Sequence, residues 1–273
     1  MRLLLSSKEK RQLELMEFLI TTRKWTHIKI LSEKFMCTER ILKQDIAELR
    51  EAFPNIDIQS STNGIRIYSA KETSIEDIYR YFFANSQNFT LLEYIFFHEG
   101  ESIAEISNAF YTTPTNLYRI VNKMEKAIET KFKINIQLSP VSITGNEIDI
   151  RYFFAQYFSE RYNFLYWPFI DFNENDLDEF AKYFYTPTNY PMGFAIFHMY
   201  KWMVMIGIYR VKNKHYVPIP ENFFEEIFPP FAQLPDIEEK LAYFSEKFQL
   251  NLTPELLAQI FISFIQDTIF CIR

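Results

Sequence analysis

Cysteine and glycine are scarce in this chain of 273 residues, which contains 2 Cys and 5 Gly. Cys37 and Cys271 stand alone in their neighbourhoods, so the sequence has neither a disulfide framework nor a Cys pair at metal-ligand spacing. A Gly-rich phosphate loop, an H-E-x-x-H sequence and a G-x-S-x-G sequence are missing as well. We therefore predict that the protein is not an enzyme and that it holds no cofactor or metal.

Targeting signals are also missing from the sequence. The N-terminal segment MRLLLSSKEKRQ turns charged within eight residues, which is unlike a signal peptide. The longest apolar stretch, residues 191–210, carries His198 and Lys201 in its middle, and it lacks the run of about 18 apolar residues that a membrane span needs. We predict that this stretch is a buried core helix and that the protein is cytoplasmic, without membrane contact.

No Ser/Gly-rich linker interrupts the chain, and 48% of its residues are apolar, so two or three packed modules are expected to abut one another. Charge is distributed unevenly along the chain. Residues 1–71 carry 13 basic against 9 acidic side chains, whereas residues 148–273 carry 10 against 16. A basic front end on an acidic protein is compatible with nucleic-acid contact confined to that end.

A duplicated segment organises the first half of the chain. A shift of 75 positions aligns HIKILSEKFMCTERILKQDIAEL (27–49) with SIAEISNAFYTTPTNLYRIVNKM (102–124). The apolar positions keep their register without a gap, since Leu42, Ile46, Leu49 and Phe53 align with Leu117, Val121, Met124 and Ile128. Their helical spacing predicts that the same helix face is buried in both copies.

Each copy is predicted to form two helices, a turn, a third helix and a β-hairpin. In the first copy, Asn63-Gly64 is the favoured two-residue turn between the strands. Thr38 and Thr113 are expected to cap the third helix of their copies. Three helices with a hairpin form a winged helix-turn-helix domain, so the sequence predicts a mainly α protein with two such domains in tandem.

The third helix of each copy has a polar face opposite its apolar one. Arg and Lys suit guanine and Asn and Gln suit adenine, while phosphates are met by basic side chains and by the hairpin tip. The side chains expected at bases are Arg40, Lys43 and Gln44 beside the small Ala47, and in the second copy Thr115, Tyr118, Arg119 and Asn122. The rest of the expected interface comprises Thr38, the basic residues Lys8, Lys10, Arg11, Arg23 and Lys24, and the hairpin tip 60–63 with Ser61 and Asn63.

Two alternatives to DNA binding stay open. A helix face with Arg, Lys and Gln can be ordinary solvated surface, and Glu39, Glu48 and Glu51 count against tight DNA contact. The winged helices can also form a protein-interaction module that does not bind DNA, for which the second copy, with Pro114 and few basic side chains, is the better candidate. Because the basic charge is modest, DNA binding is expected to need a dimer or both copies together.

The chain after residue 147 is predicted to be an all-α helical bundle. Thr253-Pro254 is a helix-start signal before the last of its helices. The predicted helices are 147–161, 175–185, 192–211, a short one at 221–227, 237–248 and 254–271. The predicted domains are 1–71, 72–147 and 148–273, the last as a sensor joined to two DNA readers.

The segment ITGNEIDIRYFFAQYF (143–158), directly after the second hairpin, resembles the Mga/AtxA family of transcriptional and virulence regulators from Gram-positive bacteria. The order of elements resembles that family over the whole chain. The resemblance implies two helix-turn-helix domains followed by a PRD-like domain (a PTS-regulation domain), transcriptional control tied to sugar uptake, and a homodimer formed through the helical part. Family members run longer, so the chain is expected to be a short form or a piece of a longer regulator.

The resemblance also implies that the sugar phosphotransferase system, acting through the phosphocarrier HPr, phosphorylates a histidine of the helical part. The candidates are His198 and His215. Lys201 follows His198 by one turn, and Lys212 and Lys214 flank His215, positions from which a cation can meet a phosphoryl group. The alternative is that each histidine is a hydrogen-bonded core residue.

Overall fold

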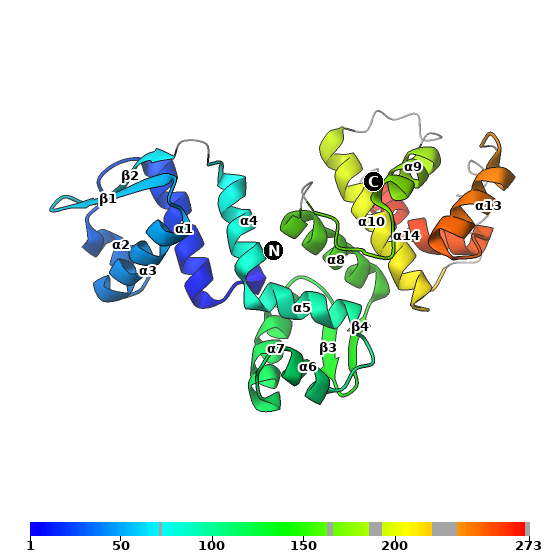
Figure 1. Ribbon diagram of the computed structural model, residues 1–273, viewed down its shortest axis with the longest axis horizontal. Helices are drawn as coiled ribbons and strands as arrows, with labels where there is room; N and C mark the ends of the chain where they lie inside the picture. Colours follow the sequence, from blue (N-terminus) through cyan, green and yellow to red (C-terminus); the bar gives the residue numbers. More distant parts are fainter. Residues whose placement is uncertain (71–72, 163–165, 186–192, 220–233, 271–273) are drawn as a thin grey trace. The chain divides into compact units, whose positions relative to one another are not determined.

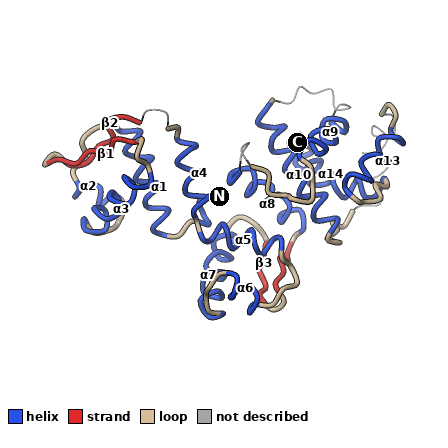
Figure 2. The backbone as a smooth tube through the Cα atoms, viewed as in Figure 1, coloured by secondary structure: helices blue, strands red, loops and turns tan. Residues whose placement is uncertain are grey.

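The computed structural model describes residues 1–70, 73–162, 166–185, 193–219 and 234–270 (Figure 1). Within these ranges the chain is mainly helical, with two short β-hairpins (Figure 2). This confirms the predicted mainly α class. The chain divides into two compact units, Met1–Phe97 and His98–Arg273. The domain boundaries expected at residues 71 and 147 stay predictions, because the division into compact units is not a division into domains.

The first unit contains a complete winged helix-turn-helix domain followed by two more helices. Its elements are the 3-10 turn η1 (Arg2–Leu4), α1 (Ser7–Thr22), α2 (Ile28–Lys34), α3 (Glu39–Ala52), β1 (Ile56–Ser61), β2 (Gly64–Ala70), α4 (Ile75–Asn85) and α5 (Gln87–Phe97).

The third helix of this domain, α3, begins and packs as the sequence predicts. The Thr38 hydroxyl accepts the Ile41 N–H at 3.3 Å, which satisfies one of the unpaired donors at the helix start. Leu42, Ile46 and Leu49 are buried. Full burial of such a side chain stabilises the fold by about 1.5–3 kcal/mol, so this row of residues fixes which face of α3 points outward.

The turn between α2 and α3 is a Schellman motif. Cys37 donates its N–H to Ser32 O at 3.0 Å, and Met36 donates to Glu33 O at 3.3 Å. Between them, Met36 adopts the left-handed conformation with φ +48°. These bonds satisfy carbonyls at the end of α2 and let the chain reverse directly into α3.

The hairpin turn lies one residue earlier than predicted. The strand register ends at Ser61 opposite Gly64, so the loop is Thr62-Asn63 rather than Asn63-Gly64. Gly64 is needed for another reason: Thr26 and Ile65 exchange two backbone hydrogen bonds of 2.9 Å, and a Cβ on Gly64 would lie 2.0 Å from Thr26 O. The glycine therefore permits a third chain segment to approach the wing.

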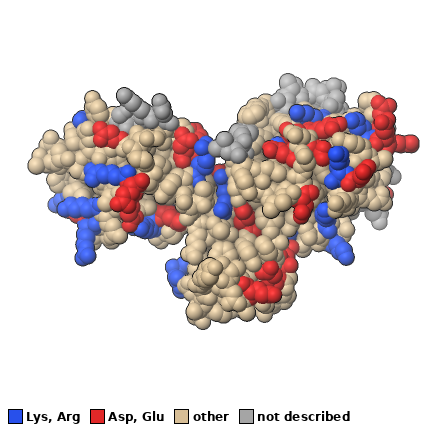
Figure 3. Space-filling model, in the orientation of Figure 1, with Lys and Arg blue, Asp and Glu red and all other residues tan. Residues whose placement is uncertain are grey.

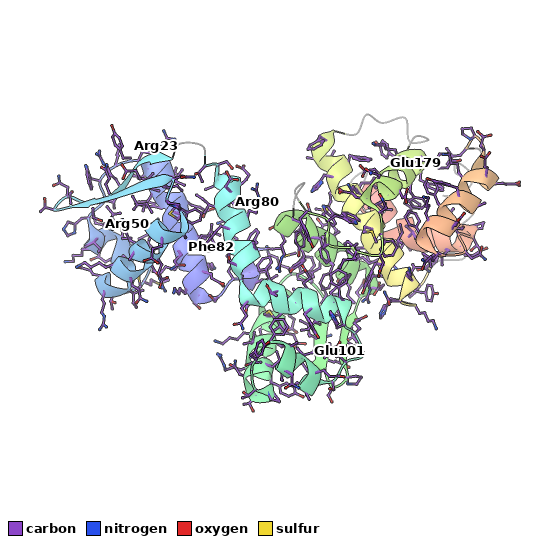
Figure 4. All side chains as sticks on the ribbon, viewed as in Figure 1. Arg23, Arg50, Arg80, Phe82, Glu101 and Glu179 are labelled. Carbon is purple, nitrogen blue, oxygen red and sulfur yellow. The ribbon has the colours of Figure 1, made fainter. Side chains whose placement is uncertain are left out.

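Helix α4 was not predicted from the sequence, yet it is part of the first core. It starts with a capping box in which Ser74 and Asp77 exchange hydrogen bonds. The Tyr81 ring lies 4.7 Å from the Phe53 ring, and Phe82 (Figure 4) contacts the same phenylalanine with a 6.3 Å centroid separation. The helix therefore extends the domain at the end of α3.

The second unit contains the second helix-turn-helix and hairpin, followed by the helical bundle. Its elements are α6 (Ile103–Ala109), α7 (Pro114–Glu129), β3 (Ile134–Leu138), β4 (Val141–Gly145), α8 (Glu147–Tyr162), α9 (Glu174–Tyr185), α10 (Phe194–Lys212), α13 (Ile237–Phe248) and α14 (Pro254–Phe270). The predicted helix ends agree with these bounds to within one or two residues wherever both are described. The predicted short helix at 221–227 lies outside the described residues.

The second copy repeats the local devices of the first. Thr113 caps α7 by accepting the Asn116 N–H at 3.3 Å, as predicted. Tyr111 has φ +48° within the same Schellman motif, where Thr112 donates its N–H to Ser107 O at 2.9 Å. Gly145, with φ +136°, ends the hairpin against the backbone of Lys133.

One residue, Asn146, separates β4 from α8. Its side-chain oxygen accepts the Ile148 N–H at 2.9 Å and the Asp149 N–H at 3.2 Å. Asn146 therefore caps α8 and joins the second hairpin directly to the first helix of the bundle.

The helical bundle is built around α10, which is almost entirely buried from Tyr200 onward. This confirms that the apolar stretch at residues 191–210 contributes a core helix where it is described. The backbones of α10 and α14 approach closely, because a Cβ on Gly207 would lie 2.5 Å from Ile260 O. Among the residues that the structure describes, no helix is both long enough and apolar enough to cross a bilayer.

Candidate nucleic-acid interface

The outward face of α3 carries the side chains that the sequence analysis assigned to bases. Arg40, Lys43 and Gln44 are exposed, on the side opposite the buried Leu42 and Ile46. Within the described residues, the charged groups of Arg40 and Lys43 have neither an ion pair nor a side-chain hydrogen bond. These two cations are therefore available to an external anion or base.

Gln44 and Lys8 are engaged by a carboxylate on the same surface. The Gln44 amide donates to Glu48 at 3.2 Å, and the Lys8 ammonium lies 2.7 Å from the Glu48 carboxylate. The hydrogen bond from Lys8 is the main cause of the lowered pKa of Glu48. Gln44 would have to leave this intrahelical bond to reach a base edge.

Arg11 is an expected phosphate contact that the geometry argues against. Its Nε donates to Asp45 Oδ2 at 2.7 Å, and a second guanidinium nitrogen donates to Oδ1 at 3.2 Å. The Asp45 side chain is only 2% exposed and also accepts from Gln12 at 3.1 Å. Arg11 therefore neutralises a buried carboxylate between α1 and α3. Lys10, by contrast, is exposed, with its nearest carboxylate, Glu14, 4.0 Å away.

The wing tip of the first copy is exposed and internally ordered. The Ser61 hydroxyl accepts the Asn63 N–H at 3.1 Å. Arg50 (Figure 4) holds the hairpin to α3, because its Nε donates to Ile58 O at 2.9 Å. The wing and the outward face of α3 are thus fixed relative to each other.

The second copy presents a less basic face. Thr115, Tyr118, Arg119 and Asn122 are all exposed on α7, opposite the buried residues of that helix. Arg119 donates to Asn116 Oδ1 at 2.9 Å. Figure 3 shows Lys and Arg side chains on the first unit with acidic side chains among them, and further Lys and Arg side chains on the helical bundle.

His198 lies in the first half of α10 and is half-buried. The Trp202 indole N–H donates to His198 Nε2 at 3.0 Å. Burial, and then the nearby Lys201 charge, lower the pKa of His198, so the ring is neutral at neutral pH. The Lys201 ammonium is already paired, at 2.6 Å from Glu174 and 2.7 Å from Asp178.

His215 belongs to a buried ion cluster, which comprises Glu99, Glu147, Arg151, Arg210 and His215. Its Nε2 lies 2.7 Å from Glu99 Oε2. The Glu99 carboxylate also accepts the backbone N–H of Ile143, in β4, at 2.8 Å. One carboxylate therefore ties the second wing to the segment that follows α10.

Arg210 is the centre of the cluster. Its Nε and a second nitrogen donate to the two oxygens of Glu147 at 2.9 and 2.7 Å, and its third nitrogen lies 3.2 Å from Glu99. The Arg210 side chain is 1% exposed. Arg151, which is equally buried, donates to Glu147 at 2.9 Å and to the His215 carbonyl at 2.9 Å.

Two opposing effects set the pKa of each glutamate in the cluster. Burial alone would raise the pKa of Glu147, but hydrogen bonds and charge from Arg210, with charge from Arg151, outweigh it and lower the pKa. Burial would also raise the pKa of Glu99, but His215 and Arg210 together outweigh it, so the pKa of Glu99 is lowered as well. Both carboxylates are therefore ionised and paired at neutral pH.

The cluster as a whole was not predicted from the sequence. Glu147 and Arg151 stand at the i, i+4 spacing of a helical ion pair, which was a detectable local signal. Glu99 and Arg210 are separated by 111 positions, and no local pattern connects them. The segment 143–158 contributes three residues to the contacts of this cluster: Ile143, Glu147 and Arg151.

Three family models match successive parts of the chain. Residues 6–65 match the M protein trans-acting positive regulator (MGA) HTH domain, and residues 71–158 match the Mga helix-turn-helix domain. Residues 173–273 match the M protein trans-acting positive regulator (MGA) PRD domain.

Curated proteins with similar sequences are regulators by name. A trans-acting regulator of Streptococcus pneumoniae serotype 4 is 40% identical over 271 residues, which cover 99% of this chain and 55% of that protein. The capsule synthesis positive regulator AcpA of Bacillus anthracis is 21% identical over 79% of this chain and 45% of its own length. The anthrax toxin expression trans-acting positive regulator of the same organism is 23% identical over 62% of this chain and 35% of its own length. The chain thus spans about half the length of the Streptococcus pneumoniae regulator and of AcpA.

Proposed function

Because the chain belongs to the Mga/AtxA family of transcriptional regulators, we propose that its two winged-helix domains bind promoter DNA and that its PRD-like helical region modulates this binding. The observation that carries the proposal is the exposed face of α3, where Arg40 and Lys43 stand without partners among the described residues. Cations held outward on a capped helix suit guanine edges and phosphates. The second copy adds Arg119 and Asn122 on α7 in the same helical register.

Sedimentation of the full chain with a promoter-length duplex tests the proposal and reports stoichiometry, including the proposed homodimer. Affinity is expected to fall with salt by a log-log slope of about 0.9 per phosphate contact. Four contacts would reduce affinity by about 100-fold between 50 and 200 mM salt. A protein-interaction module, the alternative function, would show almost no DNA affinity even at the lower salt concentration.

Two variants separate base contacts from phosphate contacts. Arg40→Ala is expected to cost about 1–3 kcal/mol of binding free energy on a selected site and to relax preference at one position, because a bidentate base contact is lost. Lys10→Ala is expected to weaken binding to all sequences alike and to reduce the salt slope by about 1. Equal losses for Arg40→Ala on selected and on random duplexes would contradict its proposed role.

We propose further that a phosphoryl group from the phosphocarrier HPr is accepted by His198 or His215. A neutral ring nitrogen is the nucleophile in such a transfer, and the lowered pKa of His198 favours that form. At His215, Glu99 holds Nε2 and leaves Nδ1 as the candidate nitrogen. The added charge of about −1.5 to −2 would oppose the two carboxylates of the buried ion cluster.

Mass spectrometry after incubation with HPr and its phosphoryl donor checks this modification. Label is expected on one of the two histidines, and it should disappear in the corresponding His198→Ala or His215→Ala variant. Absence of label from both residues of the wild-type chain would contradict the proposal while leaving DNA binding unaffected.

A further inference from the structure

Two large apolar side chains stand in the same exposed and sterically unfavourable position of the two helix-turn-helix copies. Met36 and Tyr111 align under the shift of 75 positions that relates the copies. Each has φ +48°. Met36 is 93% exposed and Tyr111 is 99% exposed. Neither side chain therefore contributes appreciably to the packing of its folded domain.

Packing and backbone geometry do not account for these residue types. The Schellman hydrogen bonds around Met36 and Tyr111 are made by backbone atoms alone. Glycine is the usual residue at this left-handed position, because a Cβ there is sterically unfavourable. Because these large apolar side chains are almost fully exposed to water, they bury no apolar surface that would offset the steric cost. The other described non-glycine residues with positive φ are all polar or charged: Arg23, Lys214, Asp236 and Gln249. The large, exposed apolar side chain at this position in both helix-turn-helix copies is therefore the feature that points to a contact outside the chain.

Both residues stand next to the face proposed to meet DNA. Met36 precedes Thr38, the cap of α3, by two residues, and Tyr111 precedes Thr113, the cap of α7, by two residues. In helix-turn-helix proteins the N-terminal residues of the recognition helix contact base edges. The two side chains therefore lie at the ends of α3 and α7 that would enter a groove.

We propose that Met36 and Tyr111 are DNA-contacting residues that lay apolar surface against the duplex, on thymine methyl groups or deoxyribose carbons. This inference rests on the proposed function. Apolar contact is the established way in which proteins recognise the thymine methyl group. The occupant is DNA rather than a protein partner because both residues adjoin the polar, partly cationic helix faces that suit a duplex.

Glycine substitution separates this role from a structural one. Met36→Gly and Tyr111→Gly relieve the left-handed strain, so the unfolding midpoint of the full chain is expected to be unchanged or higher. Affinity for a duplex selected by the wild-type chain from a randomised pool is expected to fall by about tenfold for each variant, as loss of a partly buried apolar side chain predicts. The salt slope should stay the same, because an apolar contact releases no counterions.

Matched variants and substituted duplexes complete the test. Ile170, also 93% exposed, lies outside both helix-turn-helix segments, and Ile170→Ala should leave affinity unchanged. Tyr111→Phe should retain affinity, because the ring is kept. Replacing thymine by deoxyuridine removes the methyl group. If the methyl group is the contact, this replacement should weaken binding of the wild-type chain more than binding of the Gly variants. If deoxyribose is the contact, the replacement should affect the wild-type chain and the Gly variants equally.

Unchanged affinity of both Gly variants would overturn the inference, and the loss on Arg40→Ala would then still support DNA binding by α3. Recovery of no duplex by the wild-type chain would overturn the inference together with the proposed function. Loss of affinity in a Gly variant with a lowered unfolding midpoint would also overturn it, since the side chain would then have been structural.

Discussion

Replacing Arg210 by methionine is expected to lower the free energy of unfolding of the second unit by about 3–5 kcal/mol. Methionine fills much of the same volume but leaves the carboxylates of Glu147 and Glu99 without their shared partner. These side chains are 10% and 18% exposed, so water cannot fully replace the guanidinium. An uncompensated buried charge, rather than lost packing, is the cause of the expected loss.

Urea unfolding of the full chain, followed by the fluorescence of Trp167 and Trp202 in a Trp25→Phe background, reports this loss from the second unit. Lys240→Met is the matched control, because Lys240 pairs with Glu179 (Figure 4) at 2.7 Å on the surface of the same unit. That control should leave the midpoint unchanged. The double variant Glu147→Gln, Arg210→Met should lose less than the sum of the single losses, and strict additivity would contradict the argument.

Gly145→Ala is expected to destabilise the second unit by more than about 3 kcal/mol, through two effects that act together. Its φ of +136° is a conformation that L side chains rarely adopt, and the new Cβ would lie 2.1 Å from Lys133 O. That carbonyl is fixed in place, because it accepts the Asn146 N–H at 3.1 Å. The start of β3 must therefore move, which disturbs the hairpin and the cap of α8 together.

Gly100 separates the two effects within the same unit. It has φ +97°, but nothing lies within 4 Å of the position its Cβ would take. Gly100→Ala is therefore expected to show the backbone strain alone, about 1–3 kcal/mol. Urea unfolding of both variants measures the difference, and an equal loss in both would show that the contact with Lys133 contributes nothing.

Local patterns were sufficient to predict most helices. The cap at Thr38, the row Leu42 and Ile46, and the Thr253-Pro254 start signal each depend on residues within one or two turns, and all were found where expected. The repeat of 75 positions then supplied the tandem arrangement, because a conserved register implies a repeated core. Helix α4 was missed, since no helix was predicted for residues 75–85, which lay within the predicted second domain, 72–147.

Features that depend on distant segments could not be predicted in the same way. Asn63-Gly64 is a strong hairpin signal, but glycine is needed at position 64 because the backbone of Thr26 lies against it. The sequence pattern does not connect these two residues. Arg11 looks like a surface cation until α1 and α3 pack and bring it to Asp45. A charged side chain is therefore assigned to an interface more safely once its partners in the core are known.

Asn146 gives the second unit a mechanical property of its own. A single residue joins the wing strand to α8, its side chain caps that helix, and Glu99 links the same strand to the end of α10. The wing strand β4 and the helical bundle are therefore joined without a flexible linker between them. Because Glu99 contacts both Ile143 in the wing strand and Arg210 in α10, a change in the position of α10 is expected to reach the wing directly.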